Sequence, residues 1–197
     1  ATGIDAMVHA IEAYTSKRLK NPLSDMLARE ALRLMAGNIT TAVKQGDNLE
    51  ARSAMLLGAM LAGQAFANAP VAAVHALAYP LGGNYHIPHG LSNSLVLPHV
   101  LRFNASAASE LYAELAPIIL PGKNLPSDPL ELSELLAEHF LNLAADLGLQ
   151  TRLSQMNIAE SDLPKLAQEA MLQQRLLINN PRELSLDDAL SIYQQAF

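Results

Sequence analysis

The chain has 197 residues, of which 50% are hydrophobic and 16% are charged, and its formal net charge is −6. This composition excludes a disordered chain, and the acidic balance, with no basic tract beyond residues 17–20, argues against a nucleic-acid partner. The absence of cysteine excludes disulfide scaffolds, cysteine zinc sites, iron–sulfur clusters and thiol catalysis, so any metal must be bound by His, Asp, Glu or water.

The N-terminus has neither an initiator methionine nor the basic and apolar regions of a signal peptide, and its first residues already resemble the interior of a helix. We therefore expect a piece of a longer, cytoplasmic protein.

The hydrophobic periodicity is helical almost throughout, because Ala, Leu and Met dominate and no alternating β-branched run occurs. Residues 1–197 are therefore predicted to form one all-α domain of about eight to ten helices. Proline, glycine and capping residues place these helices at 2–15, 24–44, 49–68, 71–81, from 90 to the proline at 98, 107–119, 130–147, 161–179 and from 185 onward.

Residues 53–101 contain no Lys, Arg, Asp or Glu. Such a span could belong to membrane helices, but its prolines and polar side chains leave no apolar run of the roughly 18 residues that a spanning helix needs. We therefore expect no membrane partner and favour a charge-free protein core. Because this core keeps its histidines, it is the place to look for chemistry.

Four side chains could form a metal site. Asp5 and His9 are four residues apart, so they share one face of a helix, while His75 and His89 come from a helix and a loop of the charge-free span. Taken singly, each is more simply a helix cap or a buried, hydrogen-bonded histidine. Taken together, one carboxylate and three imidazoles make a ligand set for Fe²⁺, Zn²⁺ or Mn²⁺.

Several motifs resemble the iron-containing (group III) alcohol dehydrogenases: GIDAMVHAIEAY at 3–14, VHALAYPLGG at 74–83, PHGLSN at 88–93, LP at 97–98 and NNPR at 179–182. The resemblance covers essentially the whole chain but only the C-terminal half of a full-length member. It implies that the metal ligands are Asp5, His9, His75 and His89. It also implies that a separate N-terminal domain, absent from this chain, binds most of the NAD(P).

Three further residues are expected to lie near the metal site, where substrate would bind. His86 competes with His89 as a ligand, but the family motif Pro-His-Gly favours His89, so His86 is expected, with Asn68, to contact substrate. Tyr79 follows His75 by four residues and should face the same cavity as a catalytic residue. Many family members have histidine at this position, whereas the hydroxyacid–oxoacid transhydrogenase branch resembles this chain in having tyrosine.

The resemblance implies an NAD(P)-dependent dehydrogenase that interconverts a primary alcohol and an aldehyde, with Fe²⁺ as the expected metal and a homo-oligomer as the full-length form. The isolated chain should bind metal but turn over poorly or not at all. Three alternatives remain: a transhydrogenase-like activity, a metal-dependent hydrolase with Glu12 as its base, and a non-catalytic helical module. A di-iron helical bundle would need paired Glu-x-x-His motifs, and the chain contains no such pair.

Overall fold

A computed structural model describes residues 1–197, and every element in it is helical. This confirms the predicted all-α class. The elements in chain order are α1 (Thr2–Tyr14), α2 (Pro22–Lys44), α3 (Leu49–Asn68), α4 (Ala73–Tyr85), α5 (His89–Ile119), α6 (Pro129–Asp146), the 3₁₀ turns η1 (Leu153–Met156) and η2 (Glu160–Asp162), α7 (Leu163–Met171), α8 (Gln174–Leu177) and α9 (Leu186–Ala196).

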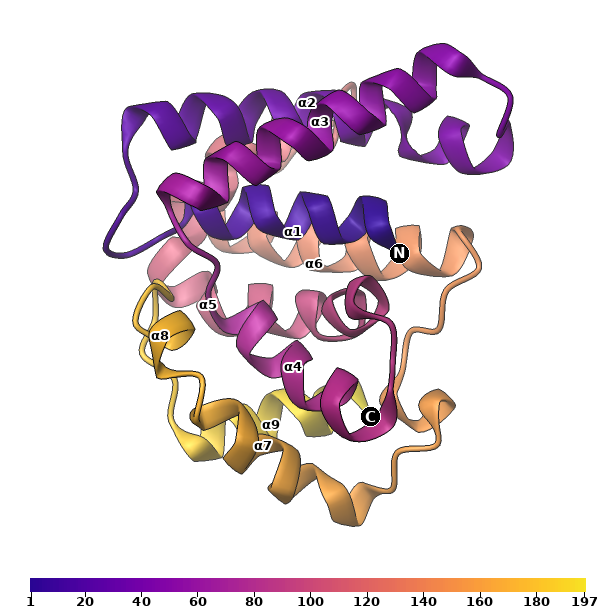
Figure 1. The fold of residues 1–197 in the computed structure, drawn as a ribbon. Coiled ribbons are helices and arrows are strands. Elements are labelled where there is room, and N and C mark those ends of the chain that lie inside the picture. Colours follow the sequence, from indigo (N-terminus) through magenta and orange to yellow (C-terminus); the bar gives the residue numbers. More distant parts are fainter.

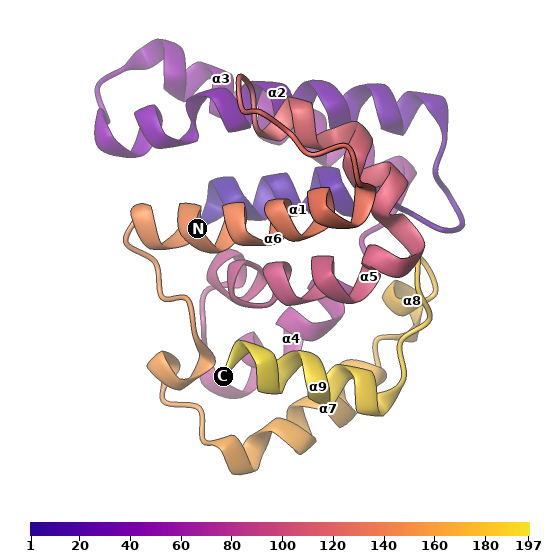
Figure 2. The same ribbon diagram turned by 180° about the vertical axis from the view of Figure 1, so that it is seen from behind.

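The helices stack in layers around α1 and α5 (Figure 1). The α2–α3 pair lies over one side of α1, and α5 packs against another side. Helix α4 joins α5 to the C-terminal layer of α7 and α9, and α6, which lies in front of α1 in the reverse view (Figure 2), packs against α5. The central position of α1 explains why most of its residues are buried and why it carries no lysine or arginine.

Side-chain caps set several helix starts. Asn21 accepts a hydrogen bond from the Ser24 amide, and Pro22 occupies the first helical position, so α2 begins two residues before the predicted start. Asp128 caps α6 in a similar way, while Ser185 and Asp188 form a capping box at α9. Local chemistry therefore explains these boundaries.

The predicted end of α4 and the predicted break at Pro98 are both wrong. The Gly-Gly pair does not stop α4, which continues to Tyr85 and ends at His86 with a left-handed φ of 56°. Helix α5 passes through Pro98 without interruption, although an internal proline costs about 3 kcal/mol. Residues 90–101 are all buried, so packing on both sides outweighs this local cost.

The single helix predicted over 161–179 is also wrong, because the chain turns between α7 and α8. The turn lets the Asn179 side chain donate to the Val71 carbonyl oxygen, 3.1 Å away, and lets Asn180 reach α5. These tertiary hydrogen bonds outweigh the helical propensity of the segment.

A cluster of buried amides, which we call the asparagine cluster, ties α5 to the segment after α8. It consists of the side-chain amides of Asn104, Asn179 and Asn180, together with Arg182. The Asn104 and Asn180 amides donate to each other's oxygens at 3.0 and 2.7 Å, and Asn180 also donates to the Arg182 carbonyl. Arg182 in turn donates to the Phe103 carbonyl and lies over the Phe103 ring. The NNPR motif at 179–182 therefore has a structural role here.

None of the helices, taken alone, combines the length and the hydropathy that a membrane-spanning segment requires. Helices α3 and α4 meet the length and composition requirement only as a pair, and they are bent by 107° at the break between them.

Candidate metal centre

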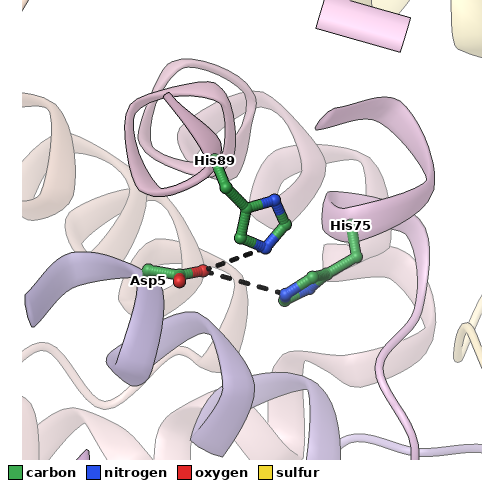
Figure 3. A group of neighbouring side chains, drawn as sticks. All are labelled: Asp5, His75 and His89. Carbon is green, nitrogen blue, oxygen red and sulfur yellow. Dashed lines mark ion pairs between the residues drawn. The ribbon is translucent and has the colours of Figure 1, made fainter. Parts of the chain in front are cut away.

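Three helices bring candidate ligands together (Figure 3). Asp5 lies in the first turn of α1, His75 in the first turn of α4, and His89 is the first residue of α5. Asp5 Oδ1 lies 3.8 Å from His75 Nε2 and 3.6 Å from His89 Nε2, and the ligand atoms of the three residues all lie within 4.8 Å of one another. The three side chains therefore point at a common place.

A glycine makes this approach possible. A Cβ atom on Gly90 would lie 2.9 Å from the Ala1 carbonyl oxygen and 3.2 Å from the Asp5 Cβ. Any side chain at this position would push the start of α5 away from α1, and with it His89 away from Asp5. The glycine of the Pro-His-Gly motif is thus required by the packing of two backbones.

His9 joins the same group. Its Nδ1 donates to the Asp5 carbonyl oxygen at 2.8 Å, which leaves the Nε2 lone pair free, and Nε2 lies 3.2 Å from His75 Nε2. Nitrogen ligands of a tetrahedral zinc ion lie about 3.3–3.4 Å apart, given bonds of about 2.0–2.1 Å. Burial is the main reason why the pKa of His9 is lowered, and proximity to His75 adds to this, so the ring is neutral at pH 7.

We call Asp5, His9, His75 and His89 the ligand cluster. Its members present carboxylate and imidazole lone pairs toward one another, an arrangement that is electrostatically unfavourable unless a cation or donated protons lie among them. The donor set of one carboxylate and three imidazoles suits a divalent first-row metal. The residues present therefore fit such an ion.

Two polar residues adjoin the ligand cluster: Asn93, which the sequence interpretation missed, and Glu12, which it considered only as the base of a hydrolase. The Asn93 amide nitrogen donates to Asp5 Oδ1 at 2.5 Å and lies 3.2 Å from His89 Nε2, while Asn93 Oδ1 is buried without a partner. Glu12 accepts a hydrogen bond from His75 and is not free to act as a hydrolytic base, which removes the support for a hydrolase. Asn93 follows His89 by four residues, so the helical spacing already pointed to it.

The other predicted residues lie farther from the ligand atoms. Tyr79 is half-buried, and its ring centroid lies 6.0 Å from that of His89. His86 is exposed at the left-handed end of α4 and is not among the converging ligands. Asn68 is exposed at the end of α3 and donates to the Gln64 carbonyl of its own helix. Phe66, which sequence reasoning missed, lies 4.7 Å from the His9 ring.

A family model described as "Fe-containing alcohol dehydrogenase family, C-terminal" matches residues 1–197. The chain belongs to this family. Its resemblance to iron-containing alcohol dehydrogenases, inferred from the motifs, is thereby confirmed. Because the match covers every residue, the ligand cluster lies within the family's C-terminal domain.

Curated relatives and solved structures agree with this membership. The chain is 40% identical to 1,3-propanediol dehydrogenase of Citrobacter freundii and 41% identical to long-chain-alcohol dehydrogenase 1 of Geobacillus thermodenitrificans, matching 100% of this chain and 50% and 49% of those proteins. A crystal structure of a 1,3-propanediol oxidoreductase superimposes with a TM-score of 0.93 at 40% identity, again over 100% of this chain and 50% of that one. The chain thus spans about half the length of the curated relatives it matches.

Proposed function

We propose that this chain is the metal-binding catalytic domain of an NAD(P)-dependent alcohol dehydrogenase that interconverts a primary alcohol and an aldehyde. The observation that carries the proposal is the convergence of Asp5, His75 and His89 from three helices, with His9 Nε2 3.2 Å from His75 Nε2, in a chain that belongs to the iron-containing alcohol dehydrogenase family. Relatives named for 1,3-propanediol, long-chain alcohols and lactaldehyde support alcohols and aldehydes as the substrate class, without restricting the chain length.

In this proposal the ligand cluster holds one divalent ion, Fe²⁺ by family and Zn²⁺ or Mn²⁺ by donor chemistry. Such an ion, when bound, supplies a Lewis acid that polarises the oxygen of an alcohol or aldehyde. Asp5 contributes the negative charge of the set, and Asn93 orients its carboxylate. The histidine rings would contribute imidazole nitrogen lone pairs.

The exposed fractions of the His75 and His89 side chains differ widely, and this difference indicates the side from which substrate approaches. The His75 side chain is 3% exposed and closes the inner side of the cluster, whereas His89 is 47% exposed and leaves its side open. Tyr79 stands beside His89 on this open side, where its hydroxyl can position the substrate oxygen or hold a proton at Oη. Phe66 and His9 form an apolar and aromatic wall that excludes water.

The nicotinamide cofactor needs a second domain in this proposal. The chain contains no strand–turn–helix phosphate site, and its relatives are about twice as long, one of them named an NAD-dependent methanol dehydrogenase. We propose that an N-terminal nucleotide-binding domain presents NAD(P) to the open side of the cluster, that the full-length protein is a homo-oligomer, and that this domain alone is inactive.

The test uses the full-length protein. Elemental analysis should find one metal ion per chain, and alcohol-dependent reduction of NAD⁺ or NADP⁺ should be lost on chelation and restored by Fe²⁺ or Zn²⁺. The variant His75→Ala should lose the metal, while His139→Ala, a histidine on α6 outside the cluster, should keep it. Equal metal content in the two variants would contradict the proposal.

Tyr79 keeps a transhydrogenase-like activity open as a second candidate, since tyrosine at this position resembles that branch of the family. Exchange of hydride between a hydroxyacid and an oxoacid without added nicotinamide would favour it. Reduction of free NAD⁺ by a simple primary alcohol would favour the dehydrogenase.

A further inference from the structure

Glu12 is a buried carboxylate whose two oxygens are both engaged. It lies on α1, three residues after His9, and is only 4% exposed. Its Oε1 accepts from the Val74 amide at 2.7 Å, and its Oε2 accepts from the Ala72 amide at 3.0 Å. The same Oε2 lies 2.7 Å from His75 Nδ1. One side chain of α1 thus accepts hydrogen bonds from two backbone amides and one histidine ring at the start of α4.

The start of α4 needs an outside partner for its amides. The residue at the N-cap is Ala72, which has no side-chain oxygen, so α4 makes no side-chain cap of its own. The first amides of a helix are otherwise unsatisfied, and a carboxylate near a helix N-terminus is also favoured by the helix dipole. Glu12 supplies this cap from a different helix, which fixes the position of α4 relative to α1.

The same carboxylate determines which nitrogen of His75 carries the proton. A carboxylate oxygen that already accepts from a backbone amide is an acceptor, so His75 Nδ1 must be the donor. The proton on Nδ1 leaves the lone pair on Nε2. That atom lies 3.2 Å from His9 Nε2 and 3.8 Å from Asp5 Oδ1, inside the ligand cluster.

We propose that Glu12 is a positioning residue of the metal centre: it holds His75 as the Nδ1–H tautomer, so that Nε2 is a ready ligand, and it ties this tautomer to the capping of α4. The inference rests on the proposed metal-binding function. This role of Glu12 differs from a purely structural one. A side chain that only capped α4 would affect folding stability without changing the metal affinity of the folded protein.

The variant Glu12→Gln separates the two roles. In the orientation that keeps the Val74 N–H bond, the NH₂ group of the new amide takes the place of Oε2, so it gives up the bond from the Ala72 N–H and faces His75 Nδ1, which then accepts and moves the ring proton to Nε2. Protonated Nε2 cannot bind a metal. In the full-length protein, Zn²⁺ affinity measured by competition with a chromophoric chelator should fall about 10- to 100-fold, the loss typical of an outer-shell partner.

Tyr193→Phe is the matched control. The Tyr193 hydroxyl donates to the Leu77 carbonyl of α4 at 2.6 Å, deep in the core and away from the ligand cluster. Its loss should lower the midpoint of thermal unfolding by a few degrees while leaving Zn²⁺ affinity within twofold of wild type. A Glu12→Gln variant with wild-type affinity would overturn the proposal.

Side-chain ¹⁵N NMR of the histidine-labelled, metal-free protein reads the tautomer directly and does not depend on metal binding. Wild-type His75 should carry its proton on Nδ1, and Glu12→Gln should move it to Nε2. A wild-type Nε2–H tautomer overturns the proposal even if the variant does not fold. Failure of the wild type to bind Zn²⁺ while the tautomer shift is observed would instead contradict the proposed metal function and leave the role of Glu12 in orienting His75 supported.

Discussion

Helix α5 contributes one residue to each of two polar clusters, His89 to the ligand cluster and Asn104 to the asparagine cluster, and the clusters differ in how their hydrogen bonds are completed. In the asparagine cluster, donors alternate with acceptors: Asn104 and Asn180 donate to each other, and Arg182 donates to a backbone carbonyl. In the ligand cluster, acceptors outnumber donors: His9 Nε2 lies 3.2 Å from His75 Nε2, and the Asn93 NH₂ group, with two protons, lies within 3.3 Å of Asp5 Oδ1, His75 Nε2 and His89 Nε2.

This difference distinguishes a structural from a binding role. A closed network satisfies its own groups, so it stabilises the fold and has no capacity left for a ligand. A group of convergent lone pairs is incomplete without a cation, so it can bind one. Mutations in the two clusters should therefore have opposite signatures, one in stability and the other in metal affinity.

The largest expected effect is that of His89→Ala. Because His89 is 47% exposed, its removal should leave the stability of the metal-free protein almost unchanged. Zn²⁺ affinity should fall by more than about 100-fold, beyond the loss expected for an outer-shell partner. Elemental analysis and thermal unfolding in EDTA measure the two effects, and His86→Ala serves as the control that keeps its metal. The reverse pattern, with metal lost only from His86→Ala, would assign the ligand to His86.

Asn104→Leu should have the opposite signature. It leaves the buried Asn180 amide without its partner, which costs about 1–3 kcal/mol of unfolding free energy. Urea unfolding measures this loss, and Zn²⁺ affinity should stay at the wild-type value. A variant as stable as wild type but weaker in metal binding would show that the two clusters are coupled.

A buried histidine outside both clusters should make stability depend on pH. Burial, reinforced by Arg102 and opposed by Glu134, lowers the pKa of His99 to about 4. The unfolded pKa is about 6.5, so between these values the unfolded state binds more protons and stability falls as pH falls, by at most about 1.4 kcal/mol per pH unit. Urea unfolding in EDTA at pH 7, 6 and 5 should show a shallower loss in His99→Gln. An identical slope would exclude His99 as the cause.

The smallest effect is expected from Tyr79→Phe in the full-length protein. If the hydroxyl positions substrate or holds a proton, kcat should fall about tenfold, or ~1.4 kcal/mol in the barrier, with metal content unchanged. Tyr79→His should keep activity and move the pH optimum toward neutral, because imidazole titrates near 6.5. Unchanged turnover and pH profile in Tyr79→Phe would reduce Tyr79 to a packing role.

The sequence predicted the helical class and most helix positions because hydrophobic periodicity and caps are local properties. It did not predict the passage of α5 through Pro98, since the burial that overrides the proline comes from helices distant in the chain. In the site, helical spacing paired Asp5 with His9, ligand chemistry suggested His75 and His89 as their partners, and the family motifs favoured His89 over His86. The role of Glu12 was out of reach, because its partners are backbone amides 60 and 62 residues away.

Helix α5 also sets where the chain can change in length. It carries His89 and Asn93 in its first turns and Asn104 in its middle, and the 15 steps from residue 89 to residue 104 span about 22 Å of a straight helix. One residue inserted between Asn93 and Asn104 would rotate the first part of α5 by about 100° relative to the rest. A single insertion would therefore misalign either His89 with the ligand cluster or Asn104 with the asparagine cluster. The segments 120–128 and 147–162, which join α5 to α6 and α6 to α7, have no such constraint. Insertions and deletions in related chains should therefore accumulate in those two connections, while the number of residues between the positions of His89 and Asn104 stays constant.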